Sequence, residues 1–175
     1  MDIPEKNVLR YLGYGIKPAD ERTVSIILQL CNELRQAIKP KSVHGLWECS
    51  VGADNVIINS TNIASADLAE HLRSYNQAIL LAATLGTEAD IFIRRYAAAN
   101  MEKAVIAEAT CTALIEEYLS ANFQGERFSP GYGDFDIIHQ KDILHWLNCG
   151  TRIGLAMTDG FMLTPSKSVT AIIGV

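Results

Sequence analysis

The stretch Arg127-Phe128-Ser129-Pro130-Gly131-Tyr132 contains the residue types best suited to a chemical role in this sequence. A Pro-Gly pair at the centre of a four-residue turn favours type II geometry, because proline presets φ and glycine accepts a positive φ. Such a turn folds Arg127 and Tyr132 back towards each other and exposes the backbone between them. Arginine binds carboxylate oxygens in pairs, and an aromatic face attracts a cation. The turn therefore suits a small ligand with a carboxylate and a cation; the alternative is a surface turn that contains an arginine.

Two further polar residues are candidates for the same site. Asp134 follows the turn and can accept hydrogen bonds from a ligand amine or a ribose hydroxyl; alternatively, its carboxylate bonds to the backbone of its own turn. Ser166 lies in the turn Thr164-Pro165-Ser166. It would line the same cleft if the strands that bear the two turns are neighbours. The alternative is an ordinary polar surface turn.

The motif resembles the Arg-x-x-x-Gly-Tyr motif of the activation (reactivation) domain of cobalamin-dependent methionine synthase, which binds S-adenosylmethionine, a molecule with both a carboxylate and a cation. The later stretch 163–170, which contains Pro165-Ser166-Lys167-Ser168-Val169, is similar to the Pro-x-x-Ser-Val segment of that domain. The opening 8–14 resembles the start of short, free-standing relatives found beside truncated synthases. The likeness to these relatives covers nearly the whole chain, and the likeness to fused synthases covers mainly the C-terminal half.

The resemblance implies one α+β domain over residues 1–175, with a mixed or antiparallel sheet packed with helices. It also implies that S-adenosylmethionine is bound by Arg127, Tyr132 and the intervening backbone, including Ser129 and Gly131. In the family, the domain offers this methyl donor to cobalamin while an electron donor, typically flavodoxin, reduces inactive cob(II)alamin. We therefore expect an accessory component rather than a complete enzyme. Its expected partners are a truncated synthase that carries the cobalamin, or another corrinoid protein, and a flavodoxin-like electron donor.

The sequence departs from the fused synthases directly after the Gly-Tyr pair. They continue with a Pro-Ala-Cys-Pro run, whereas this chain has Gly133-Asp134-Phe135-Asp136. A family acidic residue on the preceding helix falls near Ala113, with Glu108 as a loose substitute. Two alternatives stay open: a non-catalytic docking module for a corrinoid or flavodoxin-like protein, and a reactivator of another corrinoid methyltransferase. No nucleophile-and-base arrangement is visible, so no catalytic residue is assigned.

The composition narrows the class of protein. The chain has 175 residues, 49% of them apolar, and a net charge of −5, which argues against a nucleic-acid partner. Asp2, Glu5 and Lys6 do not fit a signal peptide, and no apolar run is long enough for a membrane helix. We expect a cytoplasmic protein. The cysteines at 31, 49, 111 and 149 lack metal-ligand spacing and are expected in the core, with Cys149, in a predicted loop, as the one candidate for reactivity.

Local signals predict the order of the elements. Helices are expected over 4–11, 18–38, 65–73, 87–123 with a break near 99–100, and 137–147. Ser65 and Asp136 are the predicted caps of two of them, and Thr87-x-x-Asp90 resembles a capping box. The apolar stripe of 18–38, from Val24 and Leu28 onward, is expected to lie on a sheet. Strands are predicted over 43–51 and 56–58, joined by a hairpin turn at 52–55, and over 78–85, 154–158 and 169–173.

Overall fold

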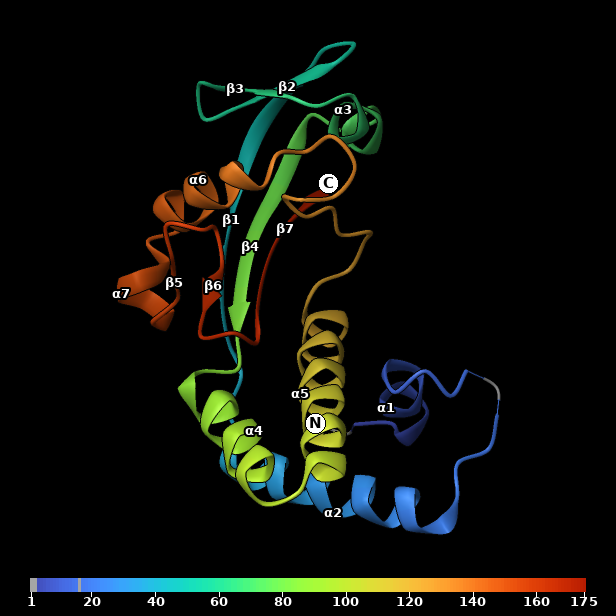
Figure 1. The fold of residues 1–175 in the computed structure, drawn as a ribbon. Helices are drawn as coiled ribbons and strands as arrows, with labels where there is room; N and C mark the ends of the chain where they lie inside the picture. Colours follow the sequence, from blue (N-terminus) through green and yellow to red (C-terminus); the bar gives the residue numbers. More distant parts are fainter. Residues whose placement is uncertain (1–2, 16) are drawn as a thin grey trace. The chain divides into compact units, whose positions relative to one another are not determined.

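The computed structural model describes residues 3–15 and 17–175, which form two compact units. Unit 1 is drawn from Met1–Lys41, Thr84–Phe123 and Pro165–Lys167, and unit 2 from Ser42–Ala83, Gln124–Thr164 and Ser168–Val175. Helices and a sheet are both present, so the predicted α+β class is confirmed (Figure 1). Asp2 lies outside the described residues, and the single domain over 1–175 stays a prediction. Among the described helices, none has the length and apolar character needed to cross a membrane.

Unit 1 is helical. It contains α1 (Glu5–Tyr11), α2 (Glu21–Ala37), α4 (Thr87–Ala99) and α5 (Met101–Asn122). The helix α5 contacts α1, α2 and α4. Its buried residues include Ala104, Ala107 and Ala113, whose small side chains let neighbouring helices approach closely. The long central helix therefore organises this unit.

The helix α2 differs from its prediction in its start and in its buried face. Asp20 accepts a hydrogen bond from the amide of Thr23 at 2.9 Å, so the helix begins after this cap rather than at Pro18. Leu28, a member of the predicted stripe, is 52% exposed, whereas Ile26 and Leu30 are buried. The reason is tertiary, because α2 packs against α5 and α1, whereas the sequence predicted that it lies on a sheet.

The boundary between α4 and α5 follows the sequence, but the start of α4 does not. Asn100 ends α4 and caps α5, accepting from the amide of Lys103 at 3.0 Å. The N-cap of α4 is Gly86, which has φ of +80° and no side-chain cap. The predicted capping box is therefore wrong. The carboxylate of Asp90 instead accepts from the backbone amide of Ser166 at 3.3 Å and from its hydroxyl.

Unit 2 contains a five-stranded sheet in the order β3-β2-β1-β4-β7. Its strands are β1 (Lys41–Val51), β2 (Asn55–Ile58), β3 (Thr61–Ala64), β4 (Gln77–Thr84) and β7 (Ser168–Gly174). The predicted hairpin turn between β1 and β2 is confirmed by a 2.8 Å bond from the amide of Gly52 to the carbonyl of Asn55. The strand β3 was not predicted. It follows β2 through a tight turn at Asn59 and Ser60, whose φ angles of 50° and 63° are rare for residues other than glycine, so the sequence contains no clear signal of a hairpin there.

Three short helices cover the sheet of unit 2 and complete its core. They are α3 (Ala66–Leu72), α6 (Gln140–Trp146) and α7 (Cys149–Ile153), with the 3₁₀ turn η1 (Ile137–His139) before α6. The predicted caps are confirmed: Ser65 accepts from the amide of Leu68, and Asp136 from that of Ile138. Figure 1 shows α6 next to α7 and close to the small hairpin of β5 (Ala156–Met157) and β6 (Leu163–Thr164). The hairpin replaces the longer strand predicted over 154–158.

The cysteines are free thiols buried in the core, as predicted. The predicted loop position of Cys149 is wrong. Cys149 is the first residue of α7, and it is fully buried. Burial raises the pKa of its thiol to about 11. A raised pKa leaves little thiolate at neutral pH, so a reactive Cys149 is not supported.

The central strand β4 gives a direct test of the core. Leu80 is fully buried within it, so Leu80→Ala should lower the free energy of unfolding by about 2–5 kcal/mol through lost burial and a residual cavity. Urea denaturation measures this change. The matched control is Leu46→Ala on β1, where the side chain is 55% exposed and the expected change is within about 0.5 kcal/mol. Equal effects of the two substitutions would contradict this assignment of the core.

Candidate functional site

The turn at Ser129–Tyr132 has the backbone geometry that the sequence predicts, whereas the approach of Arg127 to Tyr132 stays a prediction. The amide of Tyr132 donates to the carbonyl of Ser129 at 3.1 Å, which closes a four-residue turn. Gly131 occupies the third position with φ of +95°, as type II geometry requires. A Cβ at Gly131 would lie 3.7 Å from Ile137, an ordinary contact. The backbone conformation, rather than lack of space, therefore calls for glycine here.

The backbone of the turn is more fully paired than predicted. Phe128 forms an antiparallel bridge with Ile172 of β7, donating to its carbonyl at 2.9 Å and accepting from its amide at 2.8 Å. The amide of Gly131 donates to the carbonyl of Phe135 at 2.7 Å. The expectation of exposed backbone is wrong for these groups. The turn is instead an extension of the sheet that holds the side chains of half-buried Arg127 and exposed Tyr132 on a fixed support.

The turn packs on an aromatic cluster formed by Phe128, His71, Phe135 and Tyr132. The ring of Phe128 stacks on His71 of α3, with centroids 5.2 Å apart, and on Phe135 at 6.1 Å. Tyr132 meets the Phe128 ring at 82°, with a centroid distance of 6.0 Å. Because Tyr132 is still 58% exposed, much of its side chain remains accessible to a ligand. Tyr132 is thus held at one side and open at the other.

The carboxylate of Asp134 is bound to the N-terminus of α3. It accepts from the hydroxyl of Ser65 at 2.5 Å and from the amides of Ala66 at 2.8 Å and Asp67 at 3.1 Å. The Ser65 hydroxyl and the Ala66 amide lower the pKa of Asp134 below its ordinary value. In return, the carboxylate of Asp67 accepts from the amide of Asp134 at 3.0 Å. Sequence reasoning missed Asp67, because an acidic residue in the first turn of a helix is commonplace.

Ser166 belongs to unit 1, whereas the other candidates belong to one segment of unit 2. Ser166 donates to Asp90 from its amide and its hydroxyl. The ammonium of the next residue, Lys167, lies 2.5 Å from the carboxylate of Glu108 and donates to the hydroxyl of Thr112 at 3.0 Å. The loop Pro165–Lys167 is therefore fastened to α4 and α5 by two acidic side chains. Glu108, the loose substitute for a family acid, is engaged by Lys167. A shared site for Ser166 and Arg127 stays a prediction.

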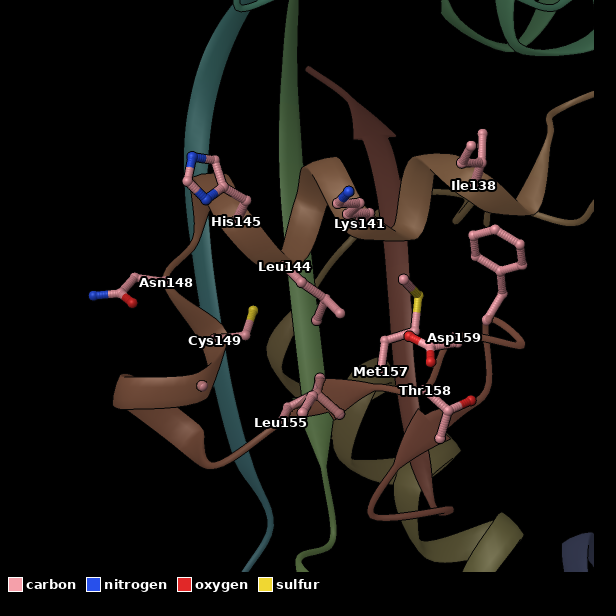
Figure 2. Close-up of a pocket in the computed structure, with 13 residues that line it drawn as sticks. Ile138, Lys141, Leu144, His145, Asn148, Cys149, Leu155, Met157, Thr158 and Asp159 are labelled. Atoms are coloured by element: carbon pink, nitrogen blue, oxygen red, sulfur yellow. The ribbon is translucent and has the colours of Figure 1, made fainter.

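A cavity of about 630 Å³ in unit 2 is lined by none of these candidates. It lies between α6, the start of α7 and β5, and Figure 2 shows Leu144 and Leu155 on opposite sides of it with the Cys149 thiol nearby. The polar side chains around it, such as Lys141, His145 and Asp159, are all exposed. A binding pocket needs a few fixed polar groups to orient its ligand. The cavity has the volume for a small molecule, but its polar lining side chains are exposed.

Comparisons with known proteins agree with the motif. Residues 109–175, which include the turn and the loop 165–167, match the family described as "Vitamin B12 dependent methionine synthase, activation domain". A solved structure, described as the "Crystal Structure of the MetH Reactivation Domain bound to AdoHcy", has the same fold with a TM-score of 0.66. The match covers 95% of this chain and 68% of that chain at 16% sequence identity. No curated protein sequence matched the chain. The resemblance predicted from the sequence is confirmed.

The lowered pKa of Asp134 predicts a pH-dependent contribution to stability. Its ordinary value is near 3.8, and a lowered value means that the native state favours the ionised carboxylate. The stabilisation should therefore be fully present above pH 3.8 and be lost as the pH falls through the lowered pKa. We expect wild type to be more stable than Asp134→Asn at pH 7 and pH 5, and the difference to shrink below about pH 3.8. Urea denaturation across this range checks it, and a difference independent of pH would contradict it.

Gly133 gives a second test of the contact between the turn and α3. Its φ is +53°, and a Cβ would lie 1.9 Å from a carboxylate oxygen of Asp67. In Gly133→Ala, Asp67 must rotate away and release the amide of Asp134. Gly154→Ala is the matched control, because Gly154 has φ of +70° with no atom within 4 Å of an added Cβ. In both variants, backbone strain should lower the free energy of unfolding by about 1 kcal/mol. Gly133→Ala should lower it by about 1 kcal/mol more, because the hydrogen bond between Asp67 and the amide of Asp134 is lost. Urea denaturation measures both changes. Equal losses would mean that Asp67 contributes nothing.

Proposed function

We propose that this chain binds S-adenosylmethionine at the Arg127 turn and presents it to cobalamin on a partner protein. The chain would act as an accessory subunit for reductive methylation of cob(II)alamin in a truncated cobalamin-dependent methionine synthase. The observation that carries the proposal is the coincidence of two findings. Residues 109–175 match the activation-domain family, and the family motif within them is folded into a type II turn anchored to β7.

The groups at the turn fit most, but not all, of this ligand. The guanidinium of Arg127 suits the methionyl carboxylate, since arginine binds carboxylates with paired hydrogen bonds. The exposed ring of Tyr132 suits the sulfonium, because an aromatic face attracts a cation. The methionyl amino group also needs an acceptor, but both oxygens of Asp134 already accept hydrogen bonds, one from the amide of Asp67 and the hydroxyl of Ser65 and the other from the amide of Ala66. The support for binding therefore comes from the carboxylate and sulfonium ends.

In the proposed role, the chain aligns the methyl donor with its acceptor and performs no acid–base catalysis. The ligand supplies a methyl group on a sulfonium, and transfer of that group to a strong nucleophile depends on the orientation of donor and acceptor. Arg127 would hold one end of the donor, and Tyr132 would fix the sulfonium that carries the methyl group. We expect the cobalamin to come from a truncated synthase or another corrinoid protein. We expect a flavodoxin-like protein to supply the electron.

A second candidate function is a docking module that binds the corrinoid or flavodoxin-like partner without a methyl donor. The engagement of Asp134 by α3 favours this candidate, since the acidic residue nearest the turn is committed within the protein. Capture of a purified cobalamin protein to the same extent with and without S-adenosylmethionine, by a chain that itself binds no S-adenosylmethionine, would support the docking module.

Isothermal calorimetry tests the proposed binding. The wild-type chain should bind S-adenosylmethionine in the micromolar range. Arg127→Ala removes charge-assisted hydrogen bonds worth about 1.5–3 kcal/mol, so the dissociation constant should rise roughly 10- to 100-fold. Arg127→Lys should recover only part of this affinity, because an ammonium cannot pair with both carboxylate oxygens in the same way.

The control for this experiment is Arg73→Ala in the same unit. The side chain of Arg73 is 69% exposed and pairs only with the exposed Glu70 of α3 among the described ion pairs. Its removal should leave the dissociation constant within about twofold, since exposed pairs contribute little. The absence of binding by wild type, or equal affinity of wild type and Arg127→Ala, would remove the proposal.

A further inference from the structure

We propose that Asp67 and Asp134 form a reciprocal clamp that positions the Arg127 turn for ligand binding. The inference rests on the proposed function, because the ligand in question is S-adenosylmethionine. In this role Asp134 is a positioning residue and not a contact to the ligand. The clamp joins two segments that are distant in the sequence, the start of α3 and the loop after Tyr132.

The hydrogen bonds of the clamp run in both directions. The side chain of Asp134 binds the first donors of α3, and the side chain of Asp67 binds the backbone amide of Asp134. The hydroxyl of Ser65 joins them, since it donates to Asp134 and accepts from the amide of Leu68. Within one helix, such an exchange of side-chain and backbone bonds is a capping box. Here its two halves come from different segments, so the cap also ties the loop to the helix.

The backbone at Gly133 is shaped to this contact. Gly133 lies between Tyr132 and Asp134 with a left-handed φ of +53°. An added Cβ would lie 1.9 Å from the carboxylate of Asp67, so only glycine lets the two segments approach this closely. The close approach of the two segments therefore depends on glycine at position 133.

The clamp holds the second end of the ligand-binding turn. The first end is fixed by the pairing of Phe128 with Ile172 of β7. Between the two anchors, the carbonyl of Tyr132 accepts from the amide of Phe135 at 2.9 Å. Without the clamp, residues 129–134 would still be held by the pairing of Phe128 and by the buried ring of Phe135, but Gly133 and Asp134 would no longer be tied to α3. A ligand would then have to order Tyr132 as it binds, and that ordering lowers affinity.

Calorimetry on a set of four variants tests the clamp. Asp134→Asn replaces one acceptor oxygen by a donor, and Asp67→Ala removes the acceptor for the amide of Asp134. Each should raise the dissociation constant for S-adenosylmethionine about tenfold, at a temperature where every variant is folded. Asp67→Asn keeps an acceptor oxygen and should restore the affinity to within about twofold of wild type.

Asp136→Asn is the matched control. Asp136 lies two residues away and caps η1 by accepting from the amide of Ile138 at 2.9 Å, so its loss also removes a cap from this loop. It makes no bond to α3 in the described structure, and its variant should keep the affinity within about twofold. If Asp134→Asn and Asp67→Ala bind as tightly as Asp136→Asn, the clamp does not position the turn and the inference is overturned.

Hydrogen exchange separates the clamp from the proposed function. In the ligand-free chain, the amides of Gly131, Tyr132 and Phe135 should exchange about tenfold faster in Asp67→Ala than in wild type or Asp136→Asn. If wild type binds no S-adenosylmethionine, the proposed function fails, but faster exchange would still support the clamp as the device that holds the turn. Unchanged exchange would overturn the clamp whether or not the ligand binds.

Discussion

The pairing of Phe128 with Ile172 is the interaction on which the candidate site depends. Phe128, the residue after Arg127, pairs with the sheet through this antiparallel bridge, so the start of the turn is held against β7. The ring of Phe128 then stacks on His71 and Phe135, which ties α3 and the downstream loop to the same point. A six-residue motif on a mobile surface loop would have to be ordered by its ligand. Because the motif is anchored to β7, most of that ordering is completed when the protein folds.

Several carboxylates of this acidic chain accept hydrogen bonds that hold two loops in place, the loop after Tyr132 and the loop Pro165–Lys167. In unit 2, Asp134 holds the turn to α3, and Asp136 caps η1. In unit 1, Asp90 and Glu108 fasten the loop Pro165–Lys167 to the helices. Each of these acids accepts from an amide, a hydroxyl or an ammonium of another segment or of the next turn of the chain. The negative charge of the chain therefore contributes to its internal connections as well as to its exposed surface.

The features that could be predicted from the sequence are those with a local physical cause. Caps such as Ser65 and Asp136 act within three residues, and the Pro-Gly turn follows from the φ preferences of two neighbours. The buried face of α2 could not be predicted as well, because the positions of α1 and α5 decide which apolar residues are covered. The bond between Asp67 and Asp134 had no local signal, since each residue is ordinary in its own segment. Sequence reasoning found the turn but missed what holds it.

The turn is a better candidate site than the cavity beside α6, although the cavity offers more volume. Burial of an apolar surface provides affinity, but a ligand with a carboxylate and a sulfonium must also exchange its hydration for fixed partners. Lys141 and His145, two of the polar residues around the cavity, are exposed, and immobilising them on binding would cost side-chain entropy. Tyr132 is packed against Phe128 and sits between two backbone anchors, so less freedom is left for it to lose. For a small charged ligand, preorganised polar and aromatic groups decide the affinity more than the size of the space around them.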